Sequence, residues 1–308
     1  MRAAILREHG GVPEVDEHPD PEGGEVLEVV AAGLNPVDRR IATGTFPSER
    51  HEPPYVAGKE GVGRRADGAL VYFEYSRDPF GAFAERTTIE PGSGYPVADG
   101  VDAGVAVAMG VSGLAAWLPL AWRAGLQEGE TVLVLGASGV VGQIAVQAAK
   151  LLGAGRVVAA ARDADALERT RALGADETVQ IAGDELAPAL REAAGGDGYD
   201  VVLDPLWGPP AAAAVLTMAS FGRLVSLGQS AGAEATFASG PVRGKPVSIL
   251  GYTNYTAGEE RKAAAYAQLT RHVAAGDIRI ELERIGLDDL PGAWRRQGSS
   301  HRKVVVIP

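Results

Sequence analysis

The sequence has 308 residues, a length typical of about two domains. Apolar residues make up 46% of it and charged residues 22%, a balance that predicts sizeable cores and excludes a disordered chain. With 29 basic and 40 acidic residues, the formal net charge is −11, which disfavours a nucleic-acid partner. Because there is no cysteine, disulfides and thiolate metal sites are excluded.

The apolar segments also bear on location. The opening run Met1–Leu6 reaches Arg7 and Glu8 too soon to hold a secretory apolar core. Every longer apolar stretch is broken well short of the roughly 18 residues that span a bilayer. We therefore expect a cytoplasmic protein with no membrane segment.

Residues 1–110 are rich in turn residues and short extended runs, and this part is expected to be mostly β. Strands are predicted at Glu25–Val30 and Ala69–Phe73. A helix is predicted over Val111–Trp122, ended by Gly125.

From residue 131 onward, apolar strands alternate with helices, which predicts a parallel sheet covered on both faces. The expected strands are Thr131–Leu135, Arg156–Ala161, Asp200–Leu203, Leu224–Leu227 and Val247–Leu250. The expected helices are Val140–Leu152, Ala164–Leu173, Leu186–Ala193 and Ala211–Met218. A further helix, Glu259–Ala275, and a strand, Val304–Ile307, resemble the first part more than the middle. We therefore expect an α/β domain, residues 123–254, inserted into a β-rich domain formed by residues 1–122 and 255–308.

A glycine-rich turn between the first strand and the first helix of the inserted domain carries the strongest local signal. It reads Gly136-Ala-Ser-Gly-Val-Val-Gly142, with Ala137 in place of the first glycine of a dinucleotide fingerprint. Such a turn lets the backbone approach a pyrophosphate at a helix N-terminus and is typical of a Rossmann-type fold. The alternative is an ordinary glycine-rich turn. The candidate cofactor-binding residues are Ala137, Ser138, Gly139, Val140, Val141 and Gly142.

The end of the second predicted strand indicates which dinucleotide binds. NAD enzymes place Asp or Glu there, whereas this chain has Ala161 followed by Arg162, which suits the 2′-phosphate of NADPH. Alternatively, Arg162 only solvates the strand end, and Asp163 beside it favours that interpretation.

Other candidate residues lie further along the chain. Gly228 is expected beside the nicotinamide, at a strand end. A basic cluster near the end of the sequence is either a solvated helix end or a wall beside the cofactor phosphate. Its members are Arg295, Arg296, Arg302 and Lys303.

Two further motifs point to other enzyme classes. Tyr55-x-x-x-Lys59 has the spacing used by short-chain dehydrogenases, but it lies upstream of the nucleotide motif instead of downstream. Gly228-x-Ser230-x-Gly232 matches a hydrolase nucleophile elbow, with His272 or His301 as the base. The segment after Gly232 is a poor helix start, which disfavours this esterase interpretation.

Seven segments that follow one another along the chain form a recognisable set. They are Gly33–Asp38, Tyr55–Gly63, Gly81–Glu85, Gly110–Trp117, the glycine turn, Leu173–Asp176 and Tyr199–Asp204. Together they resemble the medium-chain dehydrogenase/reductase superfamily, in its zinc-independent quinone oxidoreductase branch. The resemblance covers essentially the whole chain, and it implies a GroES-like fold for the β-rich catalytic domain.

The resemblance also bears on metal binding. Zinc alcohol dehydrogenases of this superfamily have a cysteine where Asn35 stands and a histidine where Lys59 stands. Asn35 and Lys59 are poor zinc ligands, and the five histidines show no ligand spacing. We therefore expect no metal.

Without zinc, reduction of a quinone or of an activated C=C bond by hydride transfer is more plausible than alcohol oxidation. Asn35 is expected to donate a hydrogen bond to the acceptor, and Lys59 to hold or protonate an enolate. The alternative for Asn35 is a turn residue before Pro36, and the alternative for Lys59 is a surface cation. Enoyl thioester reductases and several quinone reductases of this branch carry a Gly-x-Tyr where this chain has Gly44-Thr45-Phe46, so that donor is lost.

The sequence thus predicts an NADPH-dependent, zinc-independent reductase acting on a small quinone or enone. The alternatives are a nucleotide-binding protein with little turnover and an esterase using Ser230. The segment Lys245–Tyr252 should be an edge strand that pairs with a second copy, so a homodimer is expected.

Overall fold

The computed structural model describes residues 1–183, 185–296 and 301–308. The chain divides into two compact units, the first formed by residues 1–112 and 259–308 and the second by residues 113–258. The sequence-based boundaries at 122/123 and 254/255 both fall inside the second unit. One reason is that helix α3 (Val111–Leu118) runs directly into the π-helix η1 (Pro119–Ala124), which packs against strands of that unit.

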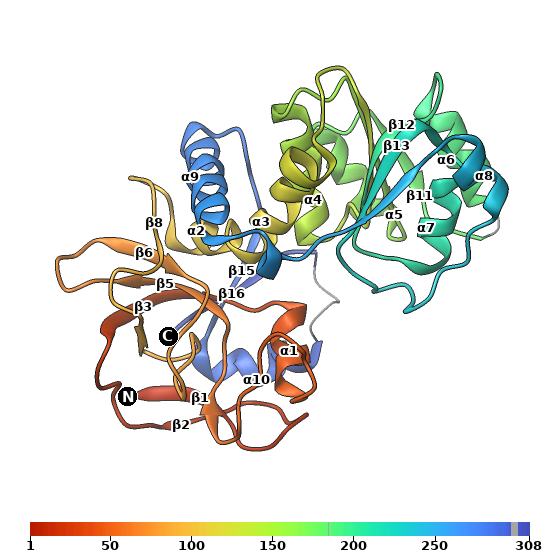
Figure 1. The fold of residues 1–308 in the computed structure, drawn as a ribbon. Helices are drawn as coiled ribbons and strands as arrows, with labels where there is room; N and C mark the ends of the chain where they lie inside the picture. The colour runs from red at the N-terminus through yellow and green to blue at the C-terminus, as the bar shows by residue number, and fades with distance from the viewer. Residues whose placement is uncertain (184, 297–300) are drawn as a thin grey trace. The chain divides into compact units, whose positions relative to one another are not determined.

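The second unit is built on a sheet whose strands are all parallel (Figure 1). Within the described residues the strand order is β11-β10-β9-β12-β13-β14. The strands are β9 (Thr131–Leu135), β10 (Arg156–Ala161), β11 (Glu177–Gln180), β12 (Tyr199–Asp204), β13 (Met218–Ser226) and β14 (Ser248–Gly251). The central strands are continuous apolar runs because both faces of the sheet are covered.

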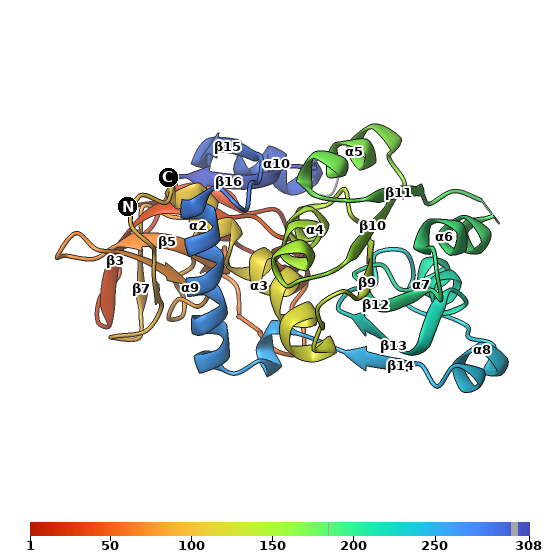
Figure 2. The same ribbon diagram turned by 90° about the horizontal axis from the view of Figure 1, so that it is seen from above.

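Helices cover both faces of this sheet. Helices α6 and α7 pack on one face through Leu190 and Ala214, and α4 lies on the other (Figure 2). The helices are α4 (Val140–Leu151), α5 (Ala164–Glu168), η2 (Arg169–Leu173), α6 (Leu186–Ala194), α7 (Gly208–Val215), α8 (Ser239–Gly244) and η3 (Asn254–Thr256). The predicted Rossmann-type doubly wound sheet is confirmed.

Two predicted helices differ from the structure. The helix expected over Ala211–Met218 ends at Val215, and Met218 instead begins β13, fully buried in the sheet core. The Thr217 hydroxyl donates to the carbonyl of Ala214 and helps to end the helix. The helix expected over Ala164–Leu173 changes from α to 3₁₀ geometry at Arg169.

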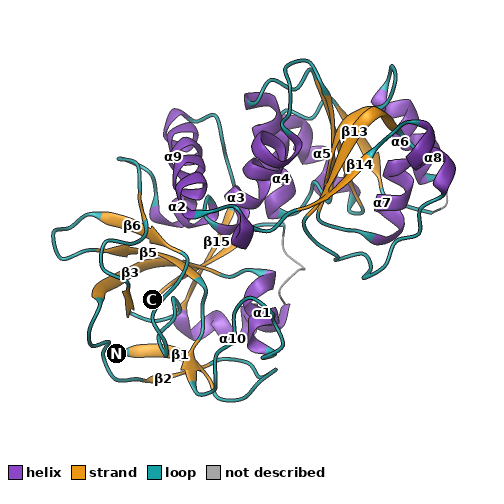
Figure 3. Ribbon diagram, in the orientation of Figure 1, coloured by secondary structure: helices purple, strands orange, loops and turns teal. Residues whose placement is uncertain are grey.

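The first unit is mostly β, as expected, with few helices among its strands (Figure 3). In the described part of the chain, one sheet has the order β15-β16-β3-β5-β6-β8, with β7 also paired to β3, and a smaller sheet has the order β2-β1-β4. The strands are β1 (Arg2–Leu6), β2 (Glu14–Glu17), β3 (Glu25–Gly33), β4 (Tyr55–Val56), β5 (Glu60–Arg64), β6 (Leu70–Phe73), β7 (Arg86–Ile89), β8 (Tyr95–Pro96), β15 (Leu282–Gly286) and β16 (Lys303–Ile307). The remaining helices are α1 (Pro36–Ala42), α2 (Ala103–Ala108), α9 (Glu259–Ala275), η4 (Leu287–Asp289) and α10 (Leu290–Arg296).

The register of the larger sheet brings distant parts of the sequence together. Strand β3 pairs with β5, with Gly33 opposite Glu60, and it pairs on its other side with β16, with Gly33 opposite Val305. The beginnings of β5 and β16 therefore lie on either side of the end of β3. This places Glu60 and Lys303 beside the loop that carries Asn35.

No helix in the described ranges is both long enough and apolar enough to cross a bilayer.

Candidate active site

The glycine turn joins the end of β9 to the start of α4. Gly136 has φ +64°, a backbone conformation that side chains with a Cβ rarely adopt. A Cβ at Gly142 would lie 2.4 Å from the Gly136 carbonyl oxygen and 2.5 Å from Cα of Ala137, so only glycine lets the helix pass this closely. The Ala137 N–H donates to Ala160, which fixes the turn against β10.

The N-terminus of α4 has backbone N–H groups that can bind an anion. Its N-cap, Gly139, has no side chain to occupy the first amides of the helix, and these amides have no partner within the helix. A Cβ at Gly139 would make only an ordinary 3.4 Å contact with the Gly136 carbonyl oxygen, so the fold itself does not require glycine there. A dinucleotide pyrophosphate fits such a cradle, because it needs close backbone approach and amide donors.

Arg162 follows β10 and is exposed. Its carbonyl accepts a hydrogen bond from the Gln180 side chain, and its guanidinium extends from a strand end where Ala161 is buried. The neighbouring Asp163 caps helix α5 by accepting from the Ala166 N–H at 2.9 Å. Asp163 therefore has a structural role as the N-cap of α5.

The segment after β13 holds two further candidates. A Cβ at Gly228 would lie 2.4 Å from the Pro205 carbonyl oxygen, so this glycine is required by the neighbouring loop. The Ser230 hydroxyl donates to the same carbonyl, and residues 231–238 after it are irregular, with α8 beginning only at Ser239. A nucleophile elbow needs a helix directly after the serine, so this feature of the esterase interpretation is missing.

In the first unit, Asn35 lies in a buried polar network and is 2% exposed. Its side-chain amide donates to the Gly33 carbonyl and, at 2.7 Å, to Oε1 of Glu60. Its Oδ1 accepts from the Lys303 ammonium at 2.6 Å and from the Ser112 hydroxyl at 3.4 Å. In this arrangement both amide hydrogens have acceptors inside the protein.

Glu60 is the centre of this network and is fully buried. Lys303 donates to its Oε1 at 2.8 Å, while the Tyr72 hydroxyl and the Val111 N–H donate to its Oε2 at 2.9 and 2.7 Å. The charge of Lys303 is thus neutralised inside the first unit by a carboxylate. Arg302, predicted beside it, is exposed and pairs with Glu281 at 3.0 Å.

Asp38 ties Asn35 to Lys59. Its carboxylate accepts the Asn35 N–H at 2.7 Å and the Lys59 N–H at 2.9 Å, so it fixes the backbone at both positions. Burial, followed by the charge of Glu60, raises the pKa of Asp38 to about 7, although the two backbone hydrogen bonds oppose this.

The Lys59 side chain is 1% exposed. Its ammonium donates to Glu49 at 2.7 Å, lies 3.7 Å from Oε1 of Glu74, and stands 4.0 Å from the centre of the Tyr75 ring. Burial acts to lower the pKa of Lys59, but the carboxylates of Glu74 and Glu49 outweigh it, and the pKa is raised. Lys59 is therefore a buried, charged lysine and not a surface cation.

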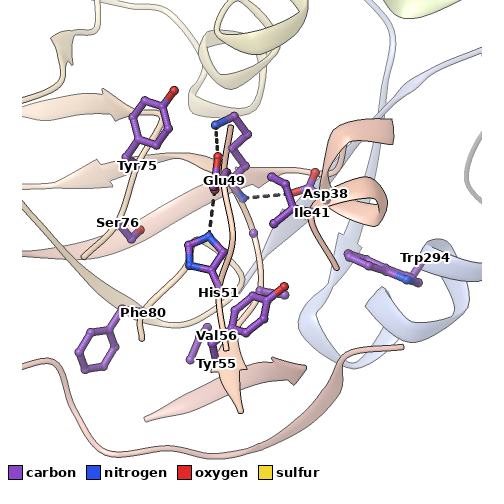
Figure 4. Close-up of a pocket in the computed structure, with 13 residues that line it drawn as sticks. Asp38, Ile41, Glu49, His51, Tyr55, Val56, Tyr75, Ser76, Phe80 and Trp294 are labelled. Atoms are coloured by element: carbon purple, nitrogen blue, oxygen red, sulfur yellow. Dashed lines mark hydrogen bonds and ion pairs between the residues drawn. The ribbon is translucent and has the colours of Figure 1, made fainter. Parts of the chain in front are cut away.

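Lys59 lines a cavity of about 70 Å³ in the first unit (Figure 4). Polar groups from Asp38, Glu49, His51 and Tyr55 share this lining. The volume is enough for a few water molecules.

Three tyrosines of the first unit contact residues of this site. The Tyr72 hydroxyl is taken by Glu60, Tyr55 packs against His51 with ring centroids 4.9 Å apart, and Tyr75 lies beside Lys59. Phe46, the residue that the resemblance led us to compare with a tyrosine, packs under the Arg40 guanidinium at 5.1 Å.

Several residues of this region received no role from the sequence. Glu49 and His51 lie in an irregular loop, so no periodicity marks them. Glu60 stands in a motif of the family resemblance but was given no role, and Lys303, which begins an apolar strand, was predicted beside the cofactor phosphate and not beside Glu60. A charged residue at the start of a buried run is a signal that could have indicated a buried pair.

Among the described residues, no group of three or more His, Cys, Asp or Glu side chains is arranged to hold a metal ion. The expected absence of zinc stays a prediction.

Comparisons with known proteins bear on both units. Residues 140–270 match the family described as zinc-binding dehydrogenase. The chain is 28% identical to a quinone oxidoreductase of Pseudomonas aeruginosa over 299 residues, covering 89% of each protein. It is 29% identical over 299 residues to a phenolphthiocerol/phthiocerol polyketide synthase chain of Mycobacterium tuberculosis, where it spans 14% of that much longer protein.

Among solved structures, the quinone oxidoreductase from Thermus thermophilus superposes with a TM-score of 0.85. It is 30% identical, and the match covers 100% of both chains. That protein has also been determined in complex with NADPH.

Proposed function

Because the chain belongs to the medium-chain dehydrogenase/reductase superfamily, in its quinone oxidoreductase branch, we propose that it uses NADPH to reduce quinones or α,β-unsaturated carbonyl compounds. The observation that carries this proposal is the turn at residues 136–142, where Gly142 is required by backbone contact and no side chain caps the first amides of α4. Such a turn suits a dinucleotide.

The cofactor would be held by the turn residues Ala137–Gly142 and by the exposed guanidinium of Arg162 on the 2′-phosphate. When bound, NADPH supplies the hydride. Gly228 remains a candidate for the nicotinamide side of the site, and Arg302 for the phosphate side. Lys303 is a weaker candidate, because Glu60 and Asn35 already bind its ammonium.

Reduction of a quinone or enone also needs a proton, and Lys59 is the proposed donor. Its ammonium is kept charged by Glu74 and Glu49, so it starts each turnover with a proton to give. Asn35 would act mainly as a positioning residue, since its amide is bound to Gly33 and Glu60. No step of this proposal uses a metal ion, and metal analysis of the purified protein should find no stoichiometric zinc.

The test is oxidation of NADPH by the purified protein in the presence of a panel of quinones and enones, followed by nicotinamide absorbance. Turnover with at least one acceptor supports the proposal. Tight NADPH binding with no oxidation by any acceptor would favour the rival, a nucleotide-binding protein with little turnover. Hydrolysis of p-nitrophenyl esters that disappears in Ser230→Ala would favour the esterase.

A matched pair of glycine substitutions tests the cradle itself. Gly139→Ala places a methyl group at the start of α4, where the pyrophosphate would lie, with only an ordinary contact to the protein. Gly240→Ala, near the start of α8, meets nothing within 4 Å and serves as the control. We expect weaker NADPH binding in the first variant alone, with both variants folding normally; equal binding would remove the turn from the proposed site.

We also propose that the protein forms a homodimer through β14. This strand lies at the edge of its sheet, and Ile249 on it is 38% exposed. An exposed edge strand can pair with a second copy across a two-fold axis. Light scattering should show a dimer that Ile249→Pro shifts toward monomer, because proline removes a ladder donor; a wild-type monomer at micromolar concentration would contradict this.

A further inference from the structure

Four ionisable side chains of the first unit form a continuous hydrogen-bonded chain of side chains that begins at Lys59. The Lys59 ammonium donates to Oε2 of Glu49 at 2.7 Å, and Oε1 of Glu49 lies 3.1 Å from Nε2 of His51. On the other side of the imidazole ring, Nδ1 of His51 lies 2.5 Å from a carboxylate oxygen of Asp78. Figure 4 shows Glu49 beside the His51 ring, with a dashed line joining the two side chains.

The exposure of these side chains rises step by step along the chain. It is 1% for Lys59, 14% for Glu49, 19% for His51 and 67% for Asp78. The chain therefore runs from a buried ammonium to solvent. The small cavity beside it, lined by the first three of these residues, has room for water.

Neighbouring groups hold the chain in place. The ring of Tyr55 packs against the His51 ring, and the two residues line the same cavity. Hydrogen bonding to Glu49 and then to Asp78 raises the pKa of His51, although burial opposes it. Burial acts to raise the pKa of Glu49, but hydrogen bonds from His51 and the charge of Lys59 hold it below its ordinary value.

Glu74 is the other carboxylate that faces Lys59. Its Oε1 lies 3.7 Å from the ammonium, beyond hydrogen-bond distance, and its Oε2 accepts from Lys262 at 3.0 Å. Lys262 in turn pairs with Glu259. A hydrogen-bonded route from Lys59 to solvent runs through Glu49 and His51.

We propose that Glu49 and His51 are a proton relay that returns a proton from solvent to Lys59 after each turnover. This inference rests on the proposed function, in which Lys59 gives a proton to the reduced acceptor. It assigns a task to two residues that lie outside every motif of the sequence.

Each turnover consumes one proton in addition to the hydride. Hydride transfer adds two electrons and one proton to the acceptor, and the remaining negative charge takes a proton as one N–H bond of Lys59 breaks. The neutral amine then accepts a proton from the Glu49 carboxyl, which received it from the His51 imidazolium and turned about its last bond. Water restores the proton to His51, and no oxidant or reductant beyond the acceptor and NADPH is needed.

The variant His51→Gln tests the relay, because glutamine can hydrogen-bond but cannot hold a titrating proton. Lys59 begins charged, so the first turnover should proceed at the wild-type rate in a stopped-flow experiment. Steady-state turnover at pH about 8 should fall by about tenfold or more, with the KM for NADPH unchanged, and added imidazole should restore part of it. The control is His272→Gln, since His272 lies in the same unit and also faces an aspartate, Asp277, but lines neither the cavity nor the relay.

The outcomes separate the two proposals. Loss of steady-state turnover with an intact first turnover and rescue by imidazole supports the relay. An equal loss in both phases without rescue, or no loss at all, overturns the relay while leaving the reductase in place. Absence of NADPH oxidation by the wild type with every acceptor overturns the proposed function, and the relay with it.

Discussion

The two regions that carry the proposed chemistry, the glycine turn and the network around Glu60, are built in different ways. The turn at residues 136–142 depends on the absence of side chains, since a Cβ at Gly142 would collide with backbone and Gly139 has no side chain to cap the helix amides. The network around Glu60 works through charged side chains held in a core, with Lys303 and Asn35 both bound to its Oε1. A backbone cradle costs little to build, whereas buried charges are stable only together.

The largest expected effect comes from breaking the buried pair. Glu60→Gln leaves the Lys303 ammonium without its carboxylate and turns an amide toward the donors Tyr72 and Val111. Removing one partner of a buried pair costs about 3–5 kcal/mol, so the free energy of unfolding should fall by that amount. Chemical denaturation of the purified variant measures it.

The neighbouring pair between Arg302 and Glu281 is the matched control. Both side chains are more than half exposed, so Glu281→Gln should change the free energy of unfolding by about 1 kcal/mol or less. Similar losses in the two variants would contradict the contrast between a buried network and a surface pair.

An intermediate effect is expected at the cradle. Arg162→Ala should raise the dissociation constant for NADPH roughly ten- to hundred-fold while leaving that for NADH nearly unchanged, because a charge-assisted contact to the 2′-phosphate is lost. Isothermal titration with both cofactors measures this. Arg243→Ala, another exposed arginine of the same unit, should leave both constants unchanged; equal losses for the two cofactors in Arg162→Ala would show a structural role.

The smallest effect concerns the pH dependence of the first unit. The pKa of His51 is raised above its ordinary value of 6.5, so its contribution to stability is fully present below that pH and is lost as the pH rises through the folded value. The difference in unfolding free energy between wild type and His51→Gln should therefore be largest below pH 6.5 and decline above it. Thermal melts across this range measure the difference. In a protein that already carries Glu49→Gln, the further substitution His51→Gln should give a smaller difference, because Glu49 is the main cause of the raised pKa of His51. A difference that stays constant with pH would show that His51 acts only by packing.

The cradle and the inserted sheet could be predicted from the sequence because their signals are local. The predicted strands Thr131–Leu135 and Arg156–Ala161 agree with β9 and β10, and the glycine motif lies between the first of them and α4 as expected. Apolar runs and glycine spacing report directly on backbone geometry.

The environment of Lys59 could not be predicted, because it depends on pairing between distant segments. Lys59 meets Glu49 from an irregular loop and Glu74 from the end of β6, and no spacing rule links these positions. The same holds for Asn35, whose partners come from β5 and β16. Sequence reasoning found the two residues but not what binds them.

The register that brings β16 beside β3 has a consequence for the order of events during synthesis. Glu60 and Lys303 are separated by 243 positions, and the whole second unit, residues 113–258, is made between them. On the ribosome, the second unit can fold first as a continuous segment, because the ammonium of Lys303 that pairs with Glu60 emerges only after that unit. The first unit therefore begins before the second and is completed after it.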